Sequence, residues 1–468
     1  MYDLLLKDAH VVDPLNGVNG VNDVAVEGGK IAAVGPDLTG PAREVIDVSG
    51  WVLQPGIIDS HVHLGSMWGS PYGPRMLAMN GVTTCLDMAG PLDDILEKTP
   101  QYGAGLNTAI LQFASPPFTF KTNAPSKAEM VELIDKSLAE GALGVKLLGG
   151  HYPLTPEVSS TLIKTALERR AYVAWHAGTS AHGSNLEGMI EAVQTADGYP
   201  LHLAHINAYC RGAIKNEIDE ARTAVELLNA NPNIFSESYI SPKNGTRLTC
   251  GPDGKIQSQV TGNCLRHFGF TEDRDGVRKA LLAHKAFAVY DAGGYSDLMT
   301  GEDAVKLWES HNTDVGGSFN INPPIPRILL AQVKRPDGAF VVDAISTDGG
   351  CIPRNVILSQ GLSLVKLDVL TLTEFAQKTS LNPARMLRLK DKGHLTVGAD
   401  ADITIYDYAA QTPKMSFVEG RKVLFKGEVL GKNANIICTE RGQKAIEARG
   451  LKAIVVDPGL PVDRVKAL

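Results

Sequence analysis

The sequence predicts an α/β fold, a (β/α)8 barrel of the TIM type with a discontinuous small β-sandwich domain. Short β-prone runs separated by Asp, Gly and Asn occur near both ends of the chain, the pattern of antiparallel strands. Between them, short apolar runs alternate with helical patterns, as expected for βα units around a parallel barrel. The β-prone runs cover residues 3–7, 10–13, 23–27, 30–34, 401–407 and 422–427.

The domain boundaries are placed where these patterns change. We predict the β-sandwich from residues 1–55 together with 390–435, and the barrel from 56–389. The barrel carries an insertion at about 240–340, a stretch longer than one βα unit needs. Residues 436–468 form a C-terminal tail with one helix predicted over 440–449.

Composition narrows the class of protein. The chain has 468 residues, of which 44% are hydrophobic and 21% charged, which is ordinary for a soluble globular enzyme. A net charge of −7 and a pI near 6.0 argue against a nucleic-acid binder. The chain contains neither a long apolar run nor a basic N-terminal region of the kind that a signal peptide needs. We therefore expect a cytoplasmic protein that does not bind membranes.

The cysteines give a second indication of the compartment. Six cysteines are scattered without a CxxC motif, which favours reduced thiols. Cys250 and Cys264 flank a Gly-rich loop, so a pair or a metal site between them is the alternative.

The first predicted barrel strand carries His61 and His63, two positions apart at the end of an apolar run. Because a strand repeats every two residues, both imidazoles project to the same side. Two neutral imidazoles can bind a borderline-soft divalent cation such as zinc. The other predicted strands cover residues 82–87, 109–113, 144–148, 171–176, 200–205, 233–237 and 340–348.

Polar residues lie on or end strands one, four, five, six and eight. In an α/β barrel the carboxyl ends of the strands form the active-site face, so these side chains would point into one mouth. Together they resemble the metal ligands of the amidohydrolase superfamily, specifically of its members with two metal ions bridged by a carboxylated lysine. The matching residues are His61, His63, Lys146, His176, His205 and Asp348.

The resemblance extends beyond the ligands. The runs at 55–59 and 392–402 also look like that family, and the similarity covers about residues 1–430. Within the superfamily, hydantoinase-like and N-acyl-amino-acid deacylase-like members are the most similar, and the sequence does not decide between them.

The resemblance implies a binuclear site. His61, His63 and Asp348 would hold one ion and His176 and His205 the other, with Lys146 shared. An ammonium cannot bind a metal, but a carbamate formed from Lys146 and CO2 offers two anionic oxygens. Zn²⁺ is the expected metal, with Mn²⁺ as the alternative. A metal-bridging hydroxide would attack the carbonyl of a C–N amide bond, with Asp348 as general base and then general acid.

Several residues have competing interpretations. His182 competes with His176, and His202 with His205; the strand-end position favours His176 and the family pattern favours His205. Asp348 precedes two glycines and could also cap a helix.

Three further residues are predicted to bind substrate. His151 and Tyr152 follow strand four, where related ring-opening enzymes place a tyrosine that contacts the oxyanion. Packing of a loop aromatic on the rim is the alternative. Arg327 follows a Pro-rich run in the insertion, so its guanidinium could be aimed at a substrate carboxylate.

We therefore expect a hydrolase acting on carbon–nitrogen bonds other than peptide bonds, with a cyclic amide or an N-acyl amino acid as its small-molecule substrate. The alternatives are a deaminase of a heterocyclic amidine and a non-catalytic scaffold that has lost its metals. A homodimer or homotetramer is expected from the resemblance.

Overall fold

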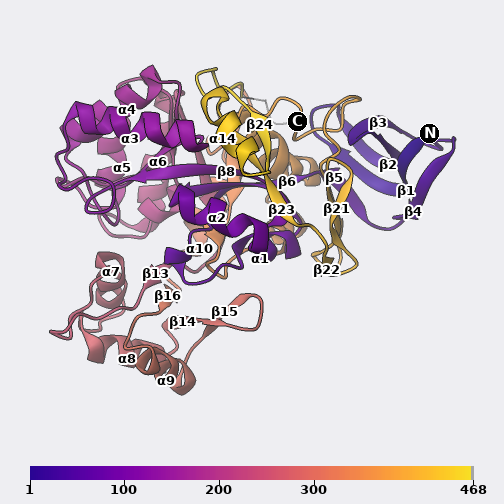
Figure 1. Cartoon of the computed structure of the whole chain (residues 1–468). Helices are drawn as coiled ribbons and strands as arrows, with labels where there is room; N and C mark the ends of the chain where they lie inside the picture. The colour runs from indigo at the N-terminus through magenta and orange to yellow at the C-terminus, as the bar shows by residue number, and fades with distance from the viewer. Residues whose placement is uncertain (465–468) are drawn as a thin grey trace.

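The computed structural model describes residues 1–464, and its centre is a parallel barrel (Figure 1). Eight strands follow one another around it in chain order. The last strand continues through Asp348 into β18 (Gly349–Gly350), which pairs in parallel with β6 and closes the ring. The predicted α/β barrel is confirmed. Its strands are β6 (Ile57–His63), β7 (Val82–Ala89), β8 (Ala104–Ala114), β9 (Gly144–Leu148), β10 (Tyr172–His176), β11 (Leu201–Leu203), β12 (Ile234–Tyr239) and β17 (Ala344–Ser346).

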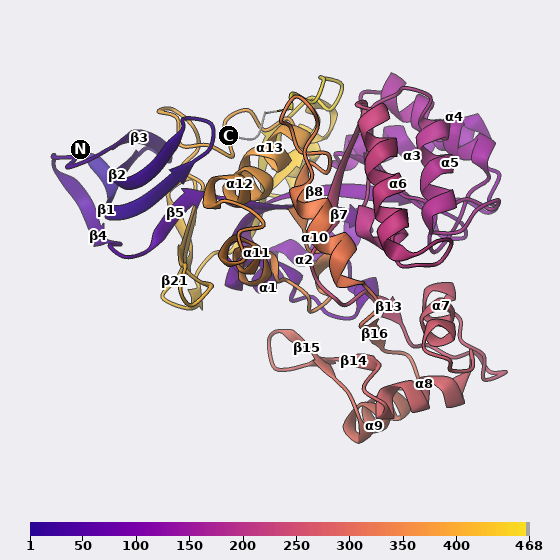
Figure 2. The same cartoon turned by 180° about the vertical axis from the view of Figure 1, so that it is seen from behind.

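Amphipathic helices cover the outside of the barrel (Figure 2). Their starts are set by local chemistry: Ser126 and Glu129 form a capping box at α3, and Thr155 caps α4. Their buried faces pack on apolar strand residues such as Val145 and Val173. The helices are α1 (Gly73–Met79), α2 (Leu92–Tyr102), α3 (Lys127–Glu140), α4 (Pro156–Glu168), α5 (Leu186–Ala196), α6 (Glu217–Ala230), α10 (Pro324–Gln332), α11 (Ile357–Lys366), α12 (Leu372–Ala376) and α13 (Asn382–Met386).

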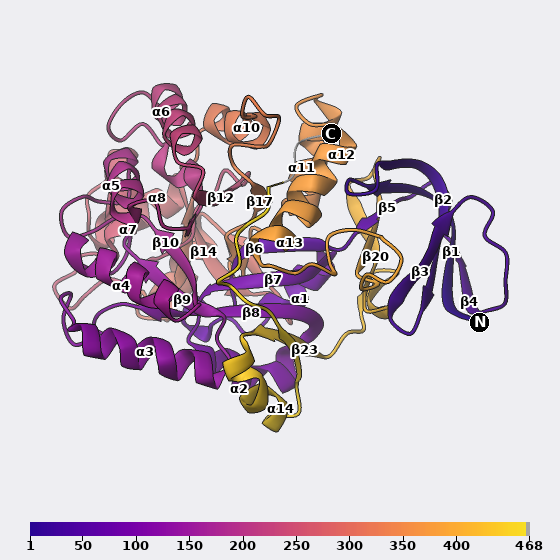
Figure 3. The same ribbon diagram turned by 90° about the horizontal axis from the view of Figure 1, so that it is seen from above.

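Both ends of the chain build one mixed β-sheet beside the barrel (Figure 3). Strand β5 pairs antiparallel with β19, which joins the N-terminal strands to the C-terminal ones. The nine strands form a single hydrogen-bonded sheet around a core that includes Leu6 and Phe417, whereas the sequence suggested a sandwich. They are β1 (Tyr2–Asp13), β2 (Val18–Glu27), β3 (Lys30–Gly35), β4 (Ala42–Asp47), β5 (Val52–Pro55), β19 (Ile403–Asp407), β20 (Thr412–Val418), β21 (Arg421–Phe425) and β22 (Glu428–Val429).

The insertion forms a small lobe below the barrel mouth (Figure 1). It has its own four-stranded sheet and its own apolar core around Leu265, Trp308 and Phe319. Helix α10 already packs in the barrel wall through Leu330, so the insertion is shorter than the predicted 240–340. Its elements are β13 (Thr246–Arg247), α7 (Gln259–His267), α8 (Arg274–Leu282), β14 (Ala286–Asp291), β15 (Ser296–Met299), α9 (Glu302–Ser310) and β16 (Gly316–Phe319).

Two segments differ from the sequence-based expectation. The run predicted as strand 340–348 is a strand only at β17, because Val341 bonds back to the carbonyl of Val333 in a local turn. The C-terminal segment adds two strands to the barrel sheet: β23 (Asn433–Cys438) pairs with β8, and β24 (Lys452–Val455) pairs with β23. Helix α14 (Gln443–Ala448) lies between them, within the predicted 440–449.

Two further findings concern the whole described chain. In residues 1–464, no helix combines the length and apolarity that a membrane span requires. All six cysteines are free, so Cys250 and Cys264 do not form a disulfide.

Candidate active site

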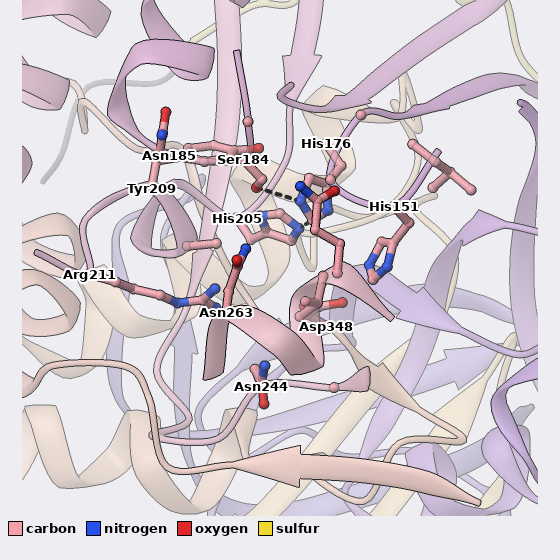
Figure 4. Close-up of a pocket in the computed structure, with 18 of the residues that line it drawn as sticks. His151, His176, Ser184, Asn185, His205, Tyr209, Arg211, Asn244, Asn263 and Asp348 are labelled. Carbon is pink, nitrogen blue, oxygen red and sulfur yellow. Dashed lines mark hydrogen bonds between the residues drawn. The ribbon is translucent and has the colours of Figure 1, made fainter. Parts of the chain in front are cut away.

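A cavity of about 760 Å³ opens at the carboxyl ends of the barrel strands. Side chains from four strand ends and from the loop after β11 converge there, and Figure 4 shows several of them pointing inward. Five of the six predicted ligands are buried and His176 is partly buried. The structure therefore brings into one cavity His61, His63, Lys146, His176, His205 and Asp348.

His61, His63 and Asp348 form the first half of this cluster. Their potential ligand atoms all lie within 4.8 Å of one another. Asp348 Oδ1 is 2.8 Å from His63 Nε2 and 3.3 Å from His61 Nε2. Burial lowers the pKa of His61 well below its usual value, which keeps the imidazole in the neutral form that binds metals. Two imidazole nitrogens and one carboxylate oxygen are a donor set that suits zinc.

His176 and His205 form the second half. The Nδ1 atom of His176 faces Nε2 of His205 at 3.0 Å, and burial lowers the pKa of both residues well below the usual value. The other ring nitrogen of His176, Nε2, lies 2.7 Å from Ser184 Oγ. If the Nε2–H group donates this hydrogen bond to Ser184, the lone pair of Nδ1 is free to bind a metal.

The backbone is strained at two of these ligands. His205 has φ 34° and Asp348 has φ 52°, both in the left-handed region that non-glycine residues rarely adopt. Each lies two residues beyond the end of a short strand, where the chain must turn away from the barrel. Such strain is kept where surrounding contacts enforce it, and it is concentrated at functional sites.

Lys146 lies on β9, between the two halves. Its side chain is buried, and Nζ is 2.9 Å from Met88 Sδ. Among residues 1–464, no carboxylate oxygen lies within 4.0 Å of this nitrogen. Burial lowers the pKa of Lys146 and favours the neutral amine. A neutral amine is the form that can react with CO2, so the environment fits the predicted carbamate.

Arg354 holds the carboxylate of Asp348. Its Nη2 is 2.6 Å from Asp348 Oδ2, and its Nε donates to the Asp348 carbonyl at 2.5 Å. Burial alone would raise the pKa of Asp348, but Arg354, His61 and His63 together keep it well below its usual range. Asp348 is therefore an anion at neutral pH. Arg354 was not predicted from the sequence, although its place six residues after a predicted ligand was a usable signal.

Glu237, which was not predicted as a site residue, connects the two halves. It lies within β12 and is fully buried. Its Oε1 accepts from His61 Nδ1 at 2.7 Å and from the His205 backbone N–H at 2.6 Å, and its Oε2 accepts from Ser346. Burial raises the pKa of Glu237, while these donors favour the carboxylate. The bond to Nδ1 turns Nε2 of His61 toward Asp348.

The two substrate-binding residues predicted after strand four, His151 and Tyr152, lie in different surroundings. His151 lines the cavity, with its ring 5.5 Å from that of His176, and burial lowers its pKa to about 4. Tyr152 does not line the cavity. Its ring packs edge-on against Phe118 at 5.1 Å and covers Leu148, so the rim-packing alternative holds for Tyr152.

The prediction that Arg327 reaches the mouth is wrong. The Pro-rich run begins helix α10, and the guanidinium donates to the carbonyls of Ile240 at 2.6 Å and Pro323 at 3.1 Å. Prolines at a helix start fix the backbone but did not aim this side chain at the cavity.

The competing histidines lie elsewhere. His202 is buried outside the cavity lining and pairs with the Tyr172 hydroxyl at 2.8 Å. His182 reaches the cavity rim and lies 3.0 Å from Glu191.

Comparison with known proteins agrees with this geometry. The amidohydrolase family profile Amidohydro_3 matches residues 363–430. A dihydroorotase from Geobacter metallireducens is 25% identical over 431 residues, which cover 86% of this chain and 90% of that enzyme. An allantoinase from Escherichia coli is 44% identical over 99 residues, 20% of this chain and 21% of that protein.

Solved structures show the same fold. D-aminoacylase superposes with a TM-score of 0.66 at 18% identity, covering 93% of this chain and 99% of that one, and it has been described with a binuclear metal center. A zinc complex of N-acyl-D-glutamate deacylase from Bordetella bronchiseptica superposes with a TM-score of 0.64 at 16% identity. The match covers 93% of this chain and 99% of the deacylase.

The barrel, its histidine–carboxylate cluster and the matches to amidohydrolase sequences together indicate a metal-dependent hydrolase of C–N bonds. The chain is similar to members of the amidohydrolase superfamily in sequence and has their fold.

Replacement of Glu237 by Gln should weaken metal binding about 10- to 100-fold, in line with the usual effect of losing a partner to a ligating histidine. An amide has only one accepting oxygen and cannot satisfy all three donors. Isothermal titration of zinc into metal-free protein would measure the change.

The matched control is Glu374→Gln, a buried glutamate outside the cavity that pairs with Lys334. It should leave zinc affinity unchanged. Equal zinc affinity in Glu237→Gln and wild type, with only a lower melting temperature, would contradict the role given to Glu237.

Proposed function

We propose that this metal-dependent amidohydrolase cleaves a C–N amide bond of a cyclic amide or of an N-acyl amino acid. The convergence of all six predicted ligands in one buried cavity supports the proposal most strongly. The similarity to dihydroorotase and allantoinase sequences and to the D-aminoacylase fold supports the same substrate classes. A screen of the metal-loaded protein against cyclic amides, N-acyl amino acids and dipeptides would test it.

The donor set fits two divalent ions, with zinc the first candidate. His61, His63 and Asp348 would hold one ion, His176 and His205 the other, and Lys146 would lie between them. When bound, such ions polarise the carbonyl and make water acidic enough to act near neutral pH.

The side chains of the cavity would move the proton and stabilise charge. Asp348 is anionic and faces the cavity, so it can take a proton from the attacking water and return it to the leaving nitrogen. Arg354 orients that carboxylate through Oδ2, while Oδ1 faces His61 and His63. The neutral imidazole of His151 can donate a hydrogen bond to the carbonyl oxygen as it gains negative charge.

We propose that Lys146 carries a carbamate. The neutral amine would add to the carbon of CO2, forming an N–C bond and releasing one proton. The product replaces a group that would repel cations with one that has two anionic oxygens. The buried position and the lack of an ion-pair partner within the described residues support the proposal.

The Lys146→Ala variant should bind fewer metal ions than wild type, one or none per chain in place of about two, and should lose most activity. Metal analysis of the purified proteins would show this, and an added short carboxylic acid should restore part of the rate. The control is Lys378→Met, since Lys378 is also fully buried but donates to Val342 outside the cavity. Full metal content in Lys146→Ala would exclude the carbamate.

The Asp348→Asn variant keeps the size of the side chain and one oxygen that can bind a metal, but its amide cannot accept the proton. We expect turnover to fall about 100-fold or more, while at least one metal stays bound. Steady-state kinetics with parallel metal analysis would measure both. Asp343→Asn serves as the control, because Asp343 is buried near the other end of β17 and bonds to Arg464. Near-normal turnover in Asp348→Asn would assign the proton transfer to another residue.

Metal analysis of the wild type also separates the alternative functions. About two ions per chain agrees with the hydrolase, one ion with a deaminase, and none with a non-catalytic scaffold. A homodimer or homotetramer and a cytoplasmic location remain predictions.

A further inference from the structure

The cavity extends from the metal ligands to a helix of the insertion. Helix α7 turns Gln259, Asn263, Arg266 and His267 toward it, residues whose spacing places them on one helical face. All four side chains are polar. The cavity volume of about 760 Å³ is in the range of sites for drug-sized ligands. A substrate that fills it has a second part beyond the scissile amide, and that part meets hydrogen-bonding groups.

Arg211 also lines this second part of the cavity. It follows the short helix after β11, and its Nε donates to Asn322 Oδ1 and its Nη2 to the Tyr239 hydroxyl, both at 2.8 Å. These two bonds fix the plane of the guanidinium. Neither Asn322 nor Tyr239 is charged. The third nitrogen of the guanidinium, Nη1, has no hydrogen-bond partner among residues 1–464.

The charge of Arg211 is uncompensated, unlike that of the other two arginines in the lining. Arg354 pairs with Asp348 and Arg266 pairs with Glu272. Within the described chain, no acidic oxygen lies within 4.0 Å of the Arg211 guanidinium, and Asp348 is the one acidic residue of the cavity lining. The group that complements Arg211 must therefore come from the ligand.

Arg211 lies near the second pair of histidines. Burial is the main cause that lowers the pKa of His176 and of His205, and the positive charge of Arg211 adds to it. Figure 4 shows Arg211 and Asn263 directed toward the same part of the cavity. Asn263 Oδ1 accepts from Arg266, which leaves its NH₂ group as a donor beside the guanidinium.

We propose that Arg211, assisted by Asn263, is an anion subsite that binds a carboxylate of the substrate at a point away from the scissile amide. This inference rests on the proposed function, because it names the substrate class of the same site. A planar guanidinium held by two bonds matches a carboxylate through paired hydrogen bonds. Because Asn263 belongs to the insertion, the insertion then takes part in substrate selection.

The test compares a charged substrate with a neutral one of the same shape. Suitable pairs are hydantoin-5-acetate with hydantoin-5-acetamide, and an N-acetyl amino acid with its primary amide. In Arg211→Met, KM for the carboxylates should rise about 10- to 100-fold, the range expected for loss of a charged hydrogen-bond pair, with a much smaller change for the amides. Arg211→Lys, which keeps the charge but not the fork, should lie between Arg211→Met and wild type.

Two further variants separate binding from folding. Asn263→Ala leaves both bonds that hold Arg211 in place, and it should raise KM for the carboxylates by about 2- to 10-fold. Arg278→Met is the control, because Arg278 pairs with Glu309 on the insertion surface outside the cavity. It should change neither KM.

Calorimetric binding of the same compounds tests the subsite without turnover. Tighter binding of the carboxylate than of the amide, lost in Arg211→Met, supports the subsite even if neither compound is hydrolysed; only the proposed function would then fail. Equal effects of Arg211→Met on both members of a pair, or none on either, overturn the subsite. Wild-type preference for the amides overturns it as well.

Discussion

The active site depends on the seam that closes the barrel. Strand β18 pairs with β6 through Gly349 and Val62 and through Gly350 and His63, and the Asp348 N–H donates to the His61 carbonyl at 2.9 Å. These backbone bonds fix Asp348 beside His61 and His63, the other predicted ligands of the same ion. The backbones of Gly350 and His63 approach closely at this seam, so a side chain at position 350 would collide with the His63 backbone. Gly350 also has φ +78°, a conformation that favours glycine.

Glu237 extends this order across the barrel. One of its oxygens receives hydrogen bonds from the side chain of His61 and from the backbone of His205, which lie in different halves of the site. A displacement of either histidine therefore disturbs the carboxylate that also holds the other. The two halves behave as one unit because they share a buried acceptor.

The sequence was informative where a local period determines which way a side chain points. The two-residue spacing of His61 and His63 and the strand-end positions of His176, His205 and Asp348 place these ligands at one face once a parallel barrel is assumed. The sequence was uninformative where tertiary contacts decide the position of a side chain. Arg327 lies beside carbonyls that its local sequence does not reveal.

Other features were hidden for the same reason. Glu237 acts through partners far along the chain, and no local pattern records such pairs. The C-terminal strand β23 becomes a strand because it finds an edge on β8, which is long enough to extend beyond the barrel. Periodicity within 433–438 does not indicate that edge.

The seam between β5 and β19 has a consequence for biosynthesis. A ribosome releases β1 to β5 long before β19 exists, because the whole barrel is translated between them. During that interval β5 presents an open edge of backbone N–H and C=O groups, the kind of surface that promotes strand addition between chains. The order of synthesis thus leaves this edge unpaired until the C-terminal strands arrive, and early docking of the N-terminal sheet onto the barrel would shorten its exposure.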